Sequence, residues 1–249
     1  MQALFDFEPS PILPRLYERL KQTFGPQVPT ARLDPASQLV KAMLSTRTYD
    51  AVSWAAFERL RGAIASWGEL ADADPRTIET LIAETTFADQ KARQLPLLFR
   101  LIGQRTGGFS LDFLADLPVD QAMAWLEDLP GVGRQIAAAV LNFSTLNKRV
   151  MVVDTHVHRV SRRLGLSGRA AEPAQSFEAL MAMAPASWSP AAFYEFHWLI
   201  KGLGQSICTD SPPACGRCPL NSLCPRIDVG VGRKVVAFTP ARTAGRRRY

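Results

Sequence analysis

The sequence has no long hydrophobic run and no basic leader segment. Its apolar stretches are all shorter than the ~20 residues that a membrane-spanning helix needs. The first charged residues are Asp6 and Glu8, whereas a secretory signal begins with basic residues. These absences lead us to expect a cytoplasmic protein that has no membrane partner.

Cysteine is absent except in one stretch of 17 residues, CTDSPPACGRCPLNSLC, which holds Cys208, Cys215, Cys218 and Cys224. Disulfides are disfavoured because a cytoplasmic compartment keeps thiols reduced. A structural zinc site usually combines two short cysteine pairs, and the spacing C-x6-C-x2-C-x5-C contains only one. Four thiolates on one loop therefore favour a [4Fe–4S] cluster as cofactor, with zinc as the alternative.

Acidic residues are missing after Asp228. Six basic residues in this tail carry the whole net charge of +6, so the rest of the chain is neutral. We expect residues 227–249 to form a basic appendage. Inside the neutral part, residues 148–169 hold six Lys and Arg side chains and one acid, Asp154. Such a patch indicates either a nucleic-acid contact or a solvated helix face.

Strand patterns are almost absent, and we predict an all-α protein. The segment DPASQLVKAMLST combines an N-cap, Asp34, with Pro35 at the first helical position and apolar residues at helical spacing. DPRTIETLIAET, from Asp74, repeats the pattern, and most of the remaining chain shows the same periodicity. Only RVMVVD resembles a strand, and it fits a buried connector equally well.

One stretch, LPGVGRQIAAAVLNF, predicts a helix–hairpin–helix. Gly131, Val132 and Gly133 would form a tight loop, since glycine permits left-handed backbone angles and close approach of another backbone. The amides at the start of the following helix would favour an anion, such as one phosphate of DNA, with Arg134 adding positive charge. The alternative is a helical hairpin that needs glycines only to turn.

Four features occur in one order between about Leu39 and Cys224: LPGVGR, VDTH-x-HRV, HWL and the cysteine set. Together they resemble the endonuclease III branch of the helix–hairpin–helix DNA glycosylases. The resemblance implies two helical lobes flanking a DNA-binding cleft: a six-helix barrel at 36–147, and a [4Fe–4S] lobe built from 1–35 and 148–226. It also implies a monomeric, nucleoid-associated enzyme that swings a damaged, mismatched or modified base out of double-stranded DNA.

The resemblance assigns the catalytic carboxylate to Asp154, which would stabilise positive charge on the sugar and orient water. The alternative for Asp154 is a helix N-cap, and both roles are compatible. Gln135 stands where family members that also cut the strand carry a lysine. We therefore predict a glycosylase without lyase activity, in which Gln135 lines the catalytic pocket. The alternatives are a lyase that uses another lysine, with Lys148 and Lys201 nearest in sequence, and a non-catalytic DNA-binding protein.

Two further positions bear on the substrate. Arg47 stands where the endonuclease III relatives have a glutamine that fills the gap left by the extruded base, and it could contact the orphaned partner. Phe87 stands near the family's leucine wedge, where an aromatic ring could stack on the opened base step. The alternative for Phe87 is a core position.

Overall fold

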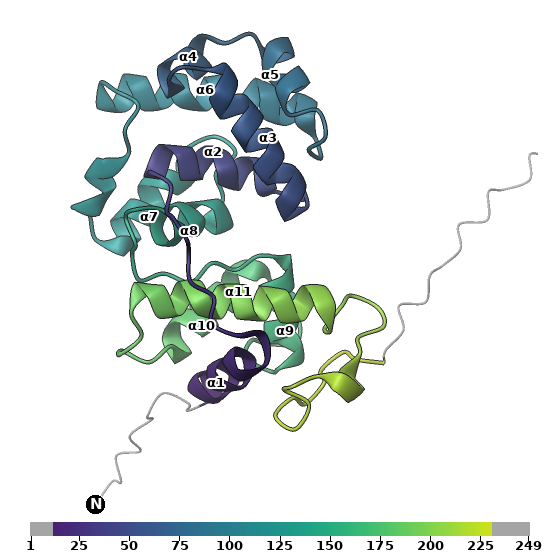
Figure 1. Ribbon diagram of the computed structural model, residues 1–249. Coiled ribbons are helices and arrows are strands. Elements are labelled where there is room, and N and C mark those ends of the chain that lie inside the picture. Colours follow the sequence, from purple (N-terminus) through teal and green to yellow (C-terminus); the bar gives the residue numbers. More distant parts are fainter. Residues whose placement is uncertain (1–11, 231–249) are drawn as a thin grey trace, which may run out of the picture.

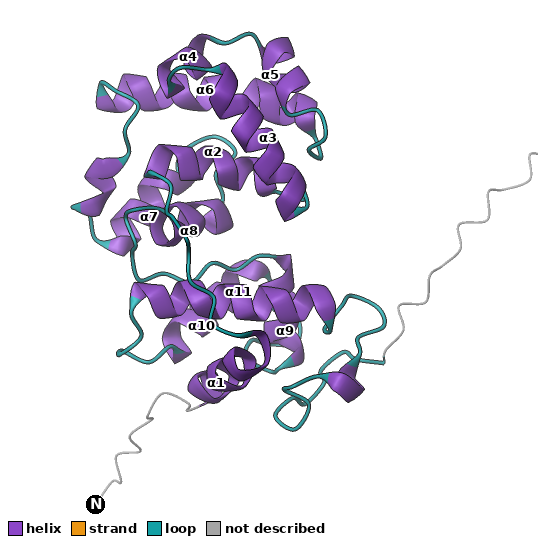
Figure 2. Cartoon of the chain, in the orientation of Figure 1, coloured by secondary structure: helices purple, strands orange, loops and turns teal. Residues whose placement is uncertain are grey.

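The computed structural model describes residues 12–230, and this part of the chain is helical without any strand (Figure 2). The all-α prediction is thereby confirmed. The helices are α1 (Ile12–Phe24), α2 (Pro35–Ser45), α3 (Asp50–Ala63), α4 (Trp67–Asp72), α5 (Pro75–Leu81), α6 (Ala88–Thr106), α7 (Val119–Glu127), α8 (Arg134–Phe143), α9 (Thr155–Arg163), α10 (Pro173–Met183) and α11 (Pro190–Ser206), with short 3-10 turns η1 (Asp112–Ala115) and η2 (Cys215–Arg217). Among the described helices, none combines the length and apolarity needed to cross a bilayer.

The helices form two lobes (Figure 1). Helices α2 to α8 make the upper lobe, in which α2 packs on α3 and α8, and α6 packs on α4 and α5. Helices α1, α9, α10 and α11 make the lower lobe together with the cysteine loop. The chain starts in the lower lobe, rises into the upper one and returns, so the lower lobe unites two distant segments, as expected. The precise domain limits stay predictions, and most of the basic tail lies outside the described residues.

Local capping explains where several helices begin. Asp34 Oδ1 accepts a hydrogen bond of 2.9 Å from the Ser37 amide, and Pro35 occupies the first turn of α2, as predicted. Ser189 caps α11 in the same way. Asp74 precedes α5 as predicted, although its side chain makes no cap hydrogen bond. These caps satisfy amides that would otherwise lack a partner in the first turn.

The segment RVMVVD is a connector rather than a strand. Its apolar residues, Val150 to Val153, are buried but have no neighbouring strand to pair with among the described residues. The connector links α8 of the upper lobe to α9 of the lower lobe and ends at Asp154. Its hydrophobicity therefore anchors the crossing between the lobes in the core.

Helices α9 and α11 approach closely at Gly204. A Cβ atom added at Gly204 would lie 2.9 Å from the Cβ atom of His156, a distance at which the backbones must move apart. Arg159 donates to the Gly204 carbonyl at 2.8 Å, and so joins the two helices at the same place. The absence of a side chain at Gly204 is thus a packing requirement of the lower lobe.

We predict that Gly204→Ala lowers the free energy of unfolding by about 1–3 kcal/mol, the usual cost of overpacking a close contact. The matched control is Gly202→Ala on the same helix, where an added Cβ atom meets nothing within 4 Å. The control should be neutral or more stable by up to about 1 kcal/mol, because alanine favours helix. Urea denaturation of both variants measures the difference, and equal effects would contradict the packing argument.

Candidate active site and nucleic-acid interface

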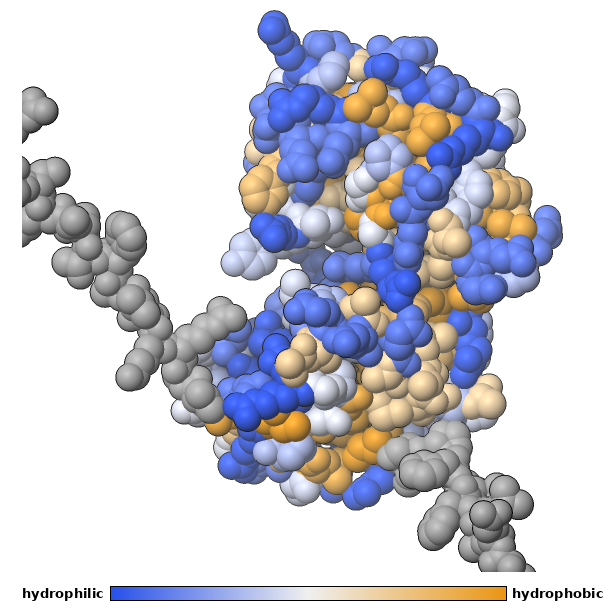
Figure 3. Space-filling view, turned by 180° about the vertical axis from the view of Figure 1, so that it is seen from behind, coloured by the Kyte–Doolittle hydropathy of each residue, from blue (hydrophilic) through white to orange (hydrophobic). Residues whose placement is uncertain are grey.

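A cavity of about 120 Å³ lies between the lobes. Figure 3, seen from behind, shows the waist at which the lobes meet and an indentation bordered by hydrophilic residues. The walls of the cavity come from α2, α3, α8, α11 and the end of the 149–154 connector. Asp154 and Gln135, which are 19 positions apart in sequence, both line it. The structure thus brings together the two residues predicted to be catalytic.

Asp154 is half-buried at the N-terminus of α9. Its Oδ1 atom accepts a hydrogen bond of 2.8 Å from the Val157 amide, so the predicted N-cap is confirmed. Its other carboxylate oxygen has no hydrogen-bond partner among residues 12–230. One oxygen therefore fixes the side chain to the helix, while the other is available to a molecule in the cavity.

The predicted hairpin is formed by α7, α8 and the loop between them. Gly131 has φ = 79°, a left-handed angle that favours glycine, and Val132 is buried beneath the loop. Gly133 is the N-cap residue of α8 and supplies no side-chain cap. The first amides of α8 therefore lack a side-chain acceptor, which is the arrangement that binds an anion at a helix N-terminus. Gln135 is exposed in this first turn.

Arg134 is already engaged within the protein. Its guanidinium pairs with Glu127 of α7 at 3.1 Å and with Glu178 of α10 at 2.6 Å, and it lies 5.2 Å from the ring centroid of Phe177. Because α7 and α10 belong to different lobes, Arg134 connects the two. A phosphate contact from Arg134 stays a prediction, and it would have to compete with these ion pairs.

The basic side chains of residues 148–169 also bind acceptors within the protein. Each of its Lys and Arg side chains donates to a backbone carbonyl, to Asp228 or to both: Lys148, Arg149, Arg159, Arg162, Arg163 and Arg169. Arg163 is buried and donates to the carbonyls of Thr209 and Asp210 in the cysteine loop. The cluster of charge in the sequence thus serves largely to hold loops in place within the protein.

Arg47 and Phe87 lie side by side on the upper lobe. The Arg47 guanidinium is 5.7 Å from the centroid of the Phe87 ring, which is 49% exposed, so the core alternative for Phe87 is wrong. Both residues have left-handed backbone angles, φ = 54° and φ = 58°. Such angles cost a non-glycine residue about 1–3 kcal/mol and concentrate at functional sites. Two loops that are distant in sequence thus present one exposed, strained pair.

Lys91, four residues after Phe87 on α6, fastens the loop of Arg47 to this helix. Its buried ammonium donates to the carbonyls of Leu44 and Thr46 and to Thr48 Oγ1, at 2.8, 3.0 and 3.1 Å. Burial lowers the pKa of Lys91 to about 8. The Thr86 hydroxyl adds a hydrogen bond of 2.8 Å to the Arg47 carbonyl.

The two lysines singled out as alternative nucleophiles are both occupied. Lys148 donates to the carbonyls of Ala115 and Leu117 and does not line the cavity. Lys201 does line the cavity, but it pairs with Asp50 at 2.7 Å. Burial would raise the pKa of Asp50, but the hydrogen bonds and charge of Lys201, with help from Gln205 and Lys41, outweigh it, so the pKa lies below its usual value.

Sequence reasoning missed a third lysine, Lys41 of α2, which lines the cavity and is only 6% exposed. The sequence around Lys41 contained a signal of this burial. Lys41 lies among Leu39, Val40, Met43 and Leu44, on a helix whose residues are almost all buried. A lysine in such a segment is rarely buried unless it has a partner or a function.

The four cysteines form no disulfide and lie half-buried in the loop after α11. Burial raises the pKa of the Cys218 and Cys224 thiols, and the negative charge of neighbouring cysteines adds to the effect. The thiols are therefore close enough to act on one another. Within residues 12–230, no three His, Cys, Asp or Glu side chains are spaced to hold a single metal ion.

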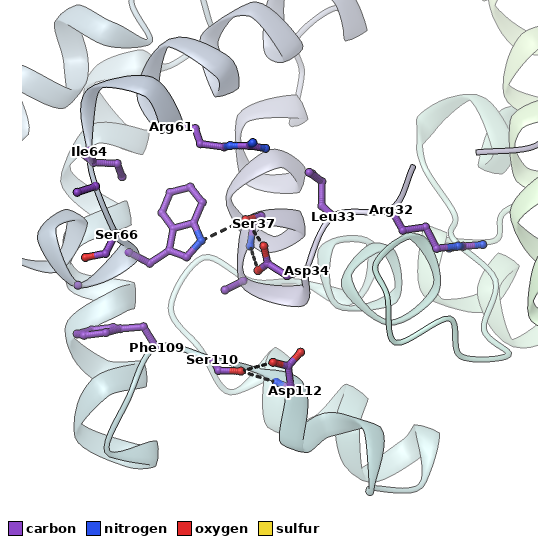
Figure 4. Close-up of a pocket in the computed structure, with 14 residues that line it drawn as sticks. Arg32, Leu33, Asp34, Ser37, Arg61, Ile64, Ser66, Phe109, Ser110 and Asp112 are labelled. Carbon is purple, nitrogen blue, oxygen red and sulfur yellow. Dashed lines mark hydrogen bonds between the residues drawn. The ribbon is translucent and has the colours of Figure 1, made fainter. Parts of the chain in front are cut away.

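A second cavity, of about 720 Å³, is an open depression on the upper lobe (Figure 4). Its polar side chains are bonded to one another: Trp67 Nε1 donates to Ser37 Oγ at 3.2 Å, Ser37 donates to Asp34, and Ser110 donates to Asp112. None of the predicted site residues lines it. The two residues predicted to be catalytic therefore line the smaller cavity between the lobes and not this depression.

Comparisons with known proteins agree with this geometry. Residues 40–186 match the family model described as HhH-GPD superfamily base excision DNA repair protein. Endonuclease III of Thermotoga maritima is 34% identical over 77% of this chain and 83% of that protein. The chloroplastic endonuclease III homolog 2 of Arabidopsis thaliana is 30% identical over 75% of this chain, which spans about half (47%) of that relative.

Among solved structures, an endonuclease III in a non-covalent complex with DNA superposes with a TM-score of 0.72 at 25% identity, covering 88% of this chain and 96% of that one. A thermostable thymine-DNA glycosylase shares the fold, with a TM-score of 0.66 at 20% identity. The predicted endonuclease III-like, two-lobed fold is confirmed. The chain belongs to the HhH-GPD superfamily of base excision DNA repair proteins.

Proposed function

We propose that the protein is a DNA glycosylase that releases a damaged, mismatched or modified base from double-stranded DNA by hydrolysis. The observation that carries this proposal is the joint position of Asp154 and the α8 N-terminus on the cavity between the lobes. A carboxylate oxygen without an internal partner and a set of uncapped amides thus border the same space. A sugar in the cavity and its neighbouring phosphate at the hairpin would satisfy both.

Asp154 supplies the chemistry in this proposal. Cleavage of the N-glycosidic bond builds positive charge on the sugar, and a nearby carboxylate stabilises that charge. The same oxygen can orient the attacking water or accept its proton. The Val157 amide holds the carboxylate in place, so that it need not reorganise during the reaction.

DNA would be held by two parts of the upper lobe. The amides around Gly131, Val132 and Gly133 would bind a phosphate without regard to sequence. Phe87 and Arg47 would enter the duplex at the extruded nucleotide, with the ring stacked on the opened step and the guanidinium on the orphaned base. Their strained, exposed conformation supports this role.

Gln135 supports a mechanism without a covalent intermediate. Its amide nitrogen has no available lone pair and cannot form the Schiff base through which a lyase cuts the strand. Lys201 is engaged in an ion pair with Asp50, and Lys148 lies outside the cavity, so neither replaces the missing amine.

The four cysteines suit a [4Fe–4S] cluster. They are the donor set that such a cluster takes, and their thiols lie near one another in one loop. Cys224 Sγ accepts a hydrogen bond from the Arg226 amide and Cys208 Sγ one from Arg163, contacts that stabilise thiolate charge. The role of the cluster would be structural, since Arg163 attaches the same loop to α9.

We predict that Asp154→Asn lowers the rate of base release by about 10²- to 10⁴-fold while duplex affinity changes little. Asparagine caps a helix as well as aspartate, so the variant should keep its stability. The rate is measured as single-turnover base release from a panel of duplexes, each with one modified base. Alkaline treatment cuts the strand at the abasic sites, so that each released base is detected as a strand break. Full activity of the folded variant would remove Asp154 from the mechanism.

Borohydride reduction of mixtures with abasic DNA tests the hydrolytic mechanism. We expect no covalent complex with the natural protein, and a trapped complex with Gln135→Lys, which places an amine where the amide now stands. A trapped complex with Gln135→Lys would show that the site can position a nucleophile. A trapped band with the natural protein would favour a glycosylase and lyase instead.

Replacement of a cysteine tests the cluster. We expect Cys218→Ser to lose the visible absorption of the purified protein and to lower its melting temperature, because the loop would no longer be tied together. Iron and sulfide analysis of the natural protein gives an independent measure. A folded, colourless variant with unchanged stability and DNA affinity would contradict a structural cluster.

A further inference from the structure

Lys41 is a buried cation with no ion pair among the described residues. It projects from α2 into the cavity that Asp154 also lines, and it is the one charged residue of this helix. The charges that act on it are Asp50 of α3 and Lys201 of α11, whereas Asp154 is not among them. The hydrogen-bond partners of the ammonium, Ser45 of α2 and Ser53 of α3, place it on the upper-lobe wall of the cavity, whereas Asp154 belongs to the α9 N-terminus in the lower lobe.

The hydrogen bonds around Lys41 leave one donor unused. Its Nζ atom donates to Ser45 Oγ at 2.8 Å and to Ser53 Oγ at 3.1 Å. Both serine hydroxyls give their own protons elsewhere, Ser45 to the Lys41 carbonyl and Ser53 to the Asp50 carbonyl. An ammonium has three donors, and the third has no oxygen or nitrogen acceptor within residues 12–230.

The surroundings of this third donor suit one flat ring. The Trp54 indole centroid lies 4.7 Å from Lys41 Nζ, and Phe143, Tyr194 and Trp198 also line the cavity. Aromatic walls stack on a nucleobase of any sequence. At about 120 Å³ the cavity is well below the ~300–1,000 Å³ typical of sites for larger ligands. The space therefore favours a single-ring base.

Resting on the proposed glycosylase function, we propose that Lys41 determines specificity by donating to a carbonyl oxygen on the remote edge of an extruded pyrimidine. The unused donor then gains an acceptor, which the protein itself does not supply. An amino group at the same position would place donor against donor and leave both unpaired. Such a site discriminates strongly between a base with a carbonyl oxygen and one with an amino group, because a buried polar group without a partner is costly.

The same contact assists the reaction. When the glycosidic bond breaks, its electron pair stays on the ring nitrogen, and the departing base carries negative charge that is shared with its carbonyl oxygens. The Lys41 ammonium stabilises that charge without giving up its proton. Water adds its oxygen to the sugar carbon, and the proton released by water ends on the ring nitrogen of the base. The atoms and charges of the hydrolysis balance without another reactant.

The protonation of Lys41 gives the proposal a pH signature. The pKa of Lys41 is lowered to about 8 as the net result of three effects. Burial lowers it most, the charge of Asp50 raises it, and the charge of Lys201 lowers it. From α8, the cavity receives only Gln135, which is uncharged, besides apolar side chains. Loss of the proton above this pKa removes the positive charge, so the rate of release should fall as the pH rises above about 8.

The decisive substrates are two duplexes that carry 5-hydroxyuracil or 5-hydroxycytosine opposite guanine. The two bases differ at one exocyclic group. We expect the natural protein to release the first at least about tenfold faster. Lys41→Met should lower kcat/KM for 5-hydroxyuracil about 100-fold, the usual effect of losing one such donor. The variant should also lose the preference between the bases and the fall in rate at high pH.

Lys148→Met is the matched control, because its amine lies outside the cavity. It should keep the preference and the pH profile. Melting temperature and affinity for undamaged duplex verify that Lys41→Met is folded. A Lys41→Met variant that retains the preference would overturn the proposal, as would a natural protein without any preference. A borohydride-trapped complex that depends on Lys41 would also overturn it, since the amine would then attack the sugar.

A binding measurement separates this proposal from the glycosylase function itself. In the Asp154→Asn background, which should not cleave, the 5-hydroxyuracil duplex should bind more tightly than the 5-hydroxycytosine duplex. Adding Lys41→Met should remove the difference. Equal binding before that change would overturn the specificity role of Lys41, even if release by the natural protein proves the protein to be a glycosylase.

Discussion

The hydrogen bond from the Val157 amide to Asp154 Oδ1 determines how the rest of the site is built. It anchors a carboxylate at the first residue after the connector between the lobes, and so places it on the cavity. The connector is fixed in turn by its buried apolar side chains. A cap that stabilises α9 therefore also sets the position of the carboxylate for which we propose the catalytic role, so stability and the proposed function depend on the same contact.

The lysines of the molecule show how neighbouring groups give one side chain different properties. Lys201 is paired with the carboxylate of Asp50. Lys91 donates to backbone carbonyls and fastens the loop of Arg47 to α6, with its donors all in use. Lys41 meets two hydroxyls and the Trp54 ring, in a buried place, and has one donor without an oxygen or nitrogen acceptor among residues 12–230. Of these three lysines, only Lys41 combines burial with a donor that a ligand could use.

The two lobes are joined by polar contacts that surround the cavity. Arg134 links α8 to both α7 and α10, and Lys201 links α11 to the start of α3. These ion pairs are partly exposed, so each contributes modestly to stability. Because the walls of the cavity come from both lobes, these contacts hold the walls in register.

The sequence alone determined the helical class, the hairpin, the cap at Asp154 and the family, because each depends on neighbouring residues or on short motifs in a fixed order. Only the tertiary structure decided which basic side chains are paired within the protein and which are available to a ligand. Arg134 and the basic segment 148–169 looked available for DNA, yet they bind carboxylates and carbonyls from distant segments. Lys41 looked like one polar residue in an amphipathic helix, yet it is buried on the cavity. A side chain's partners are set by contacts between segments far apart in the chain, and no local pattern records them.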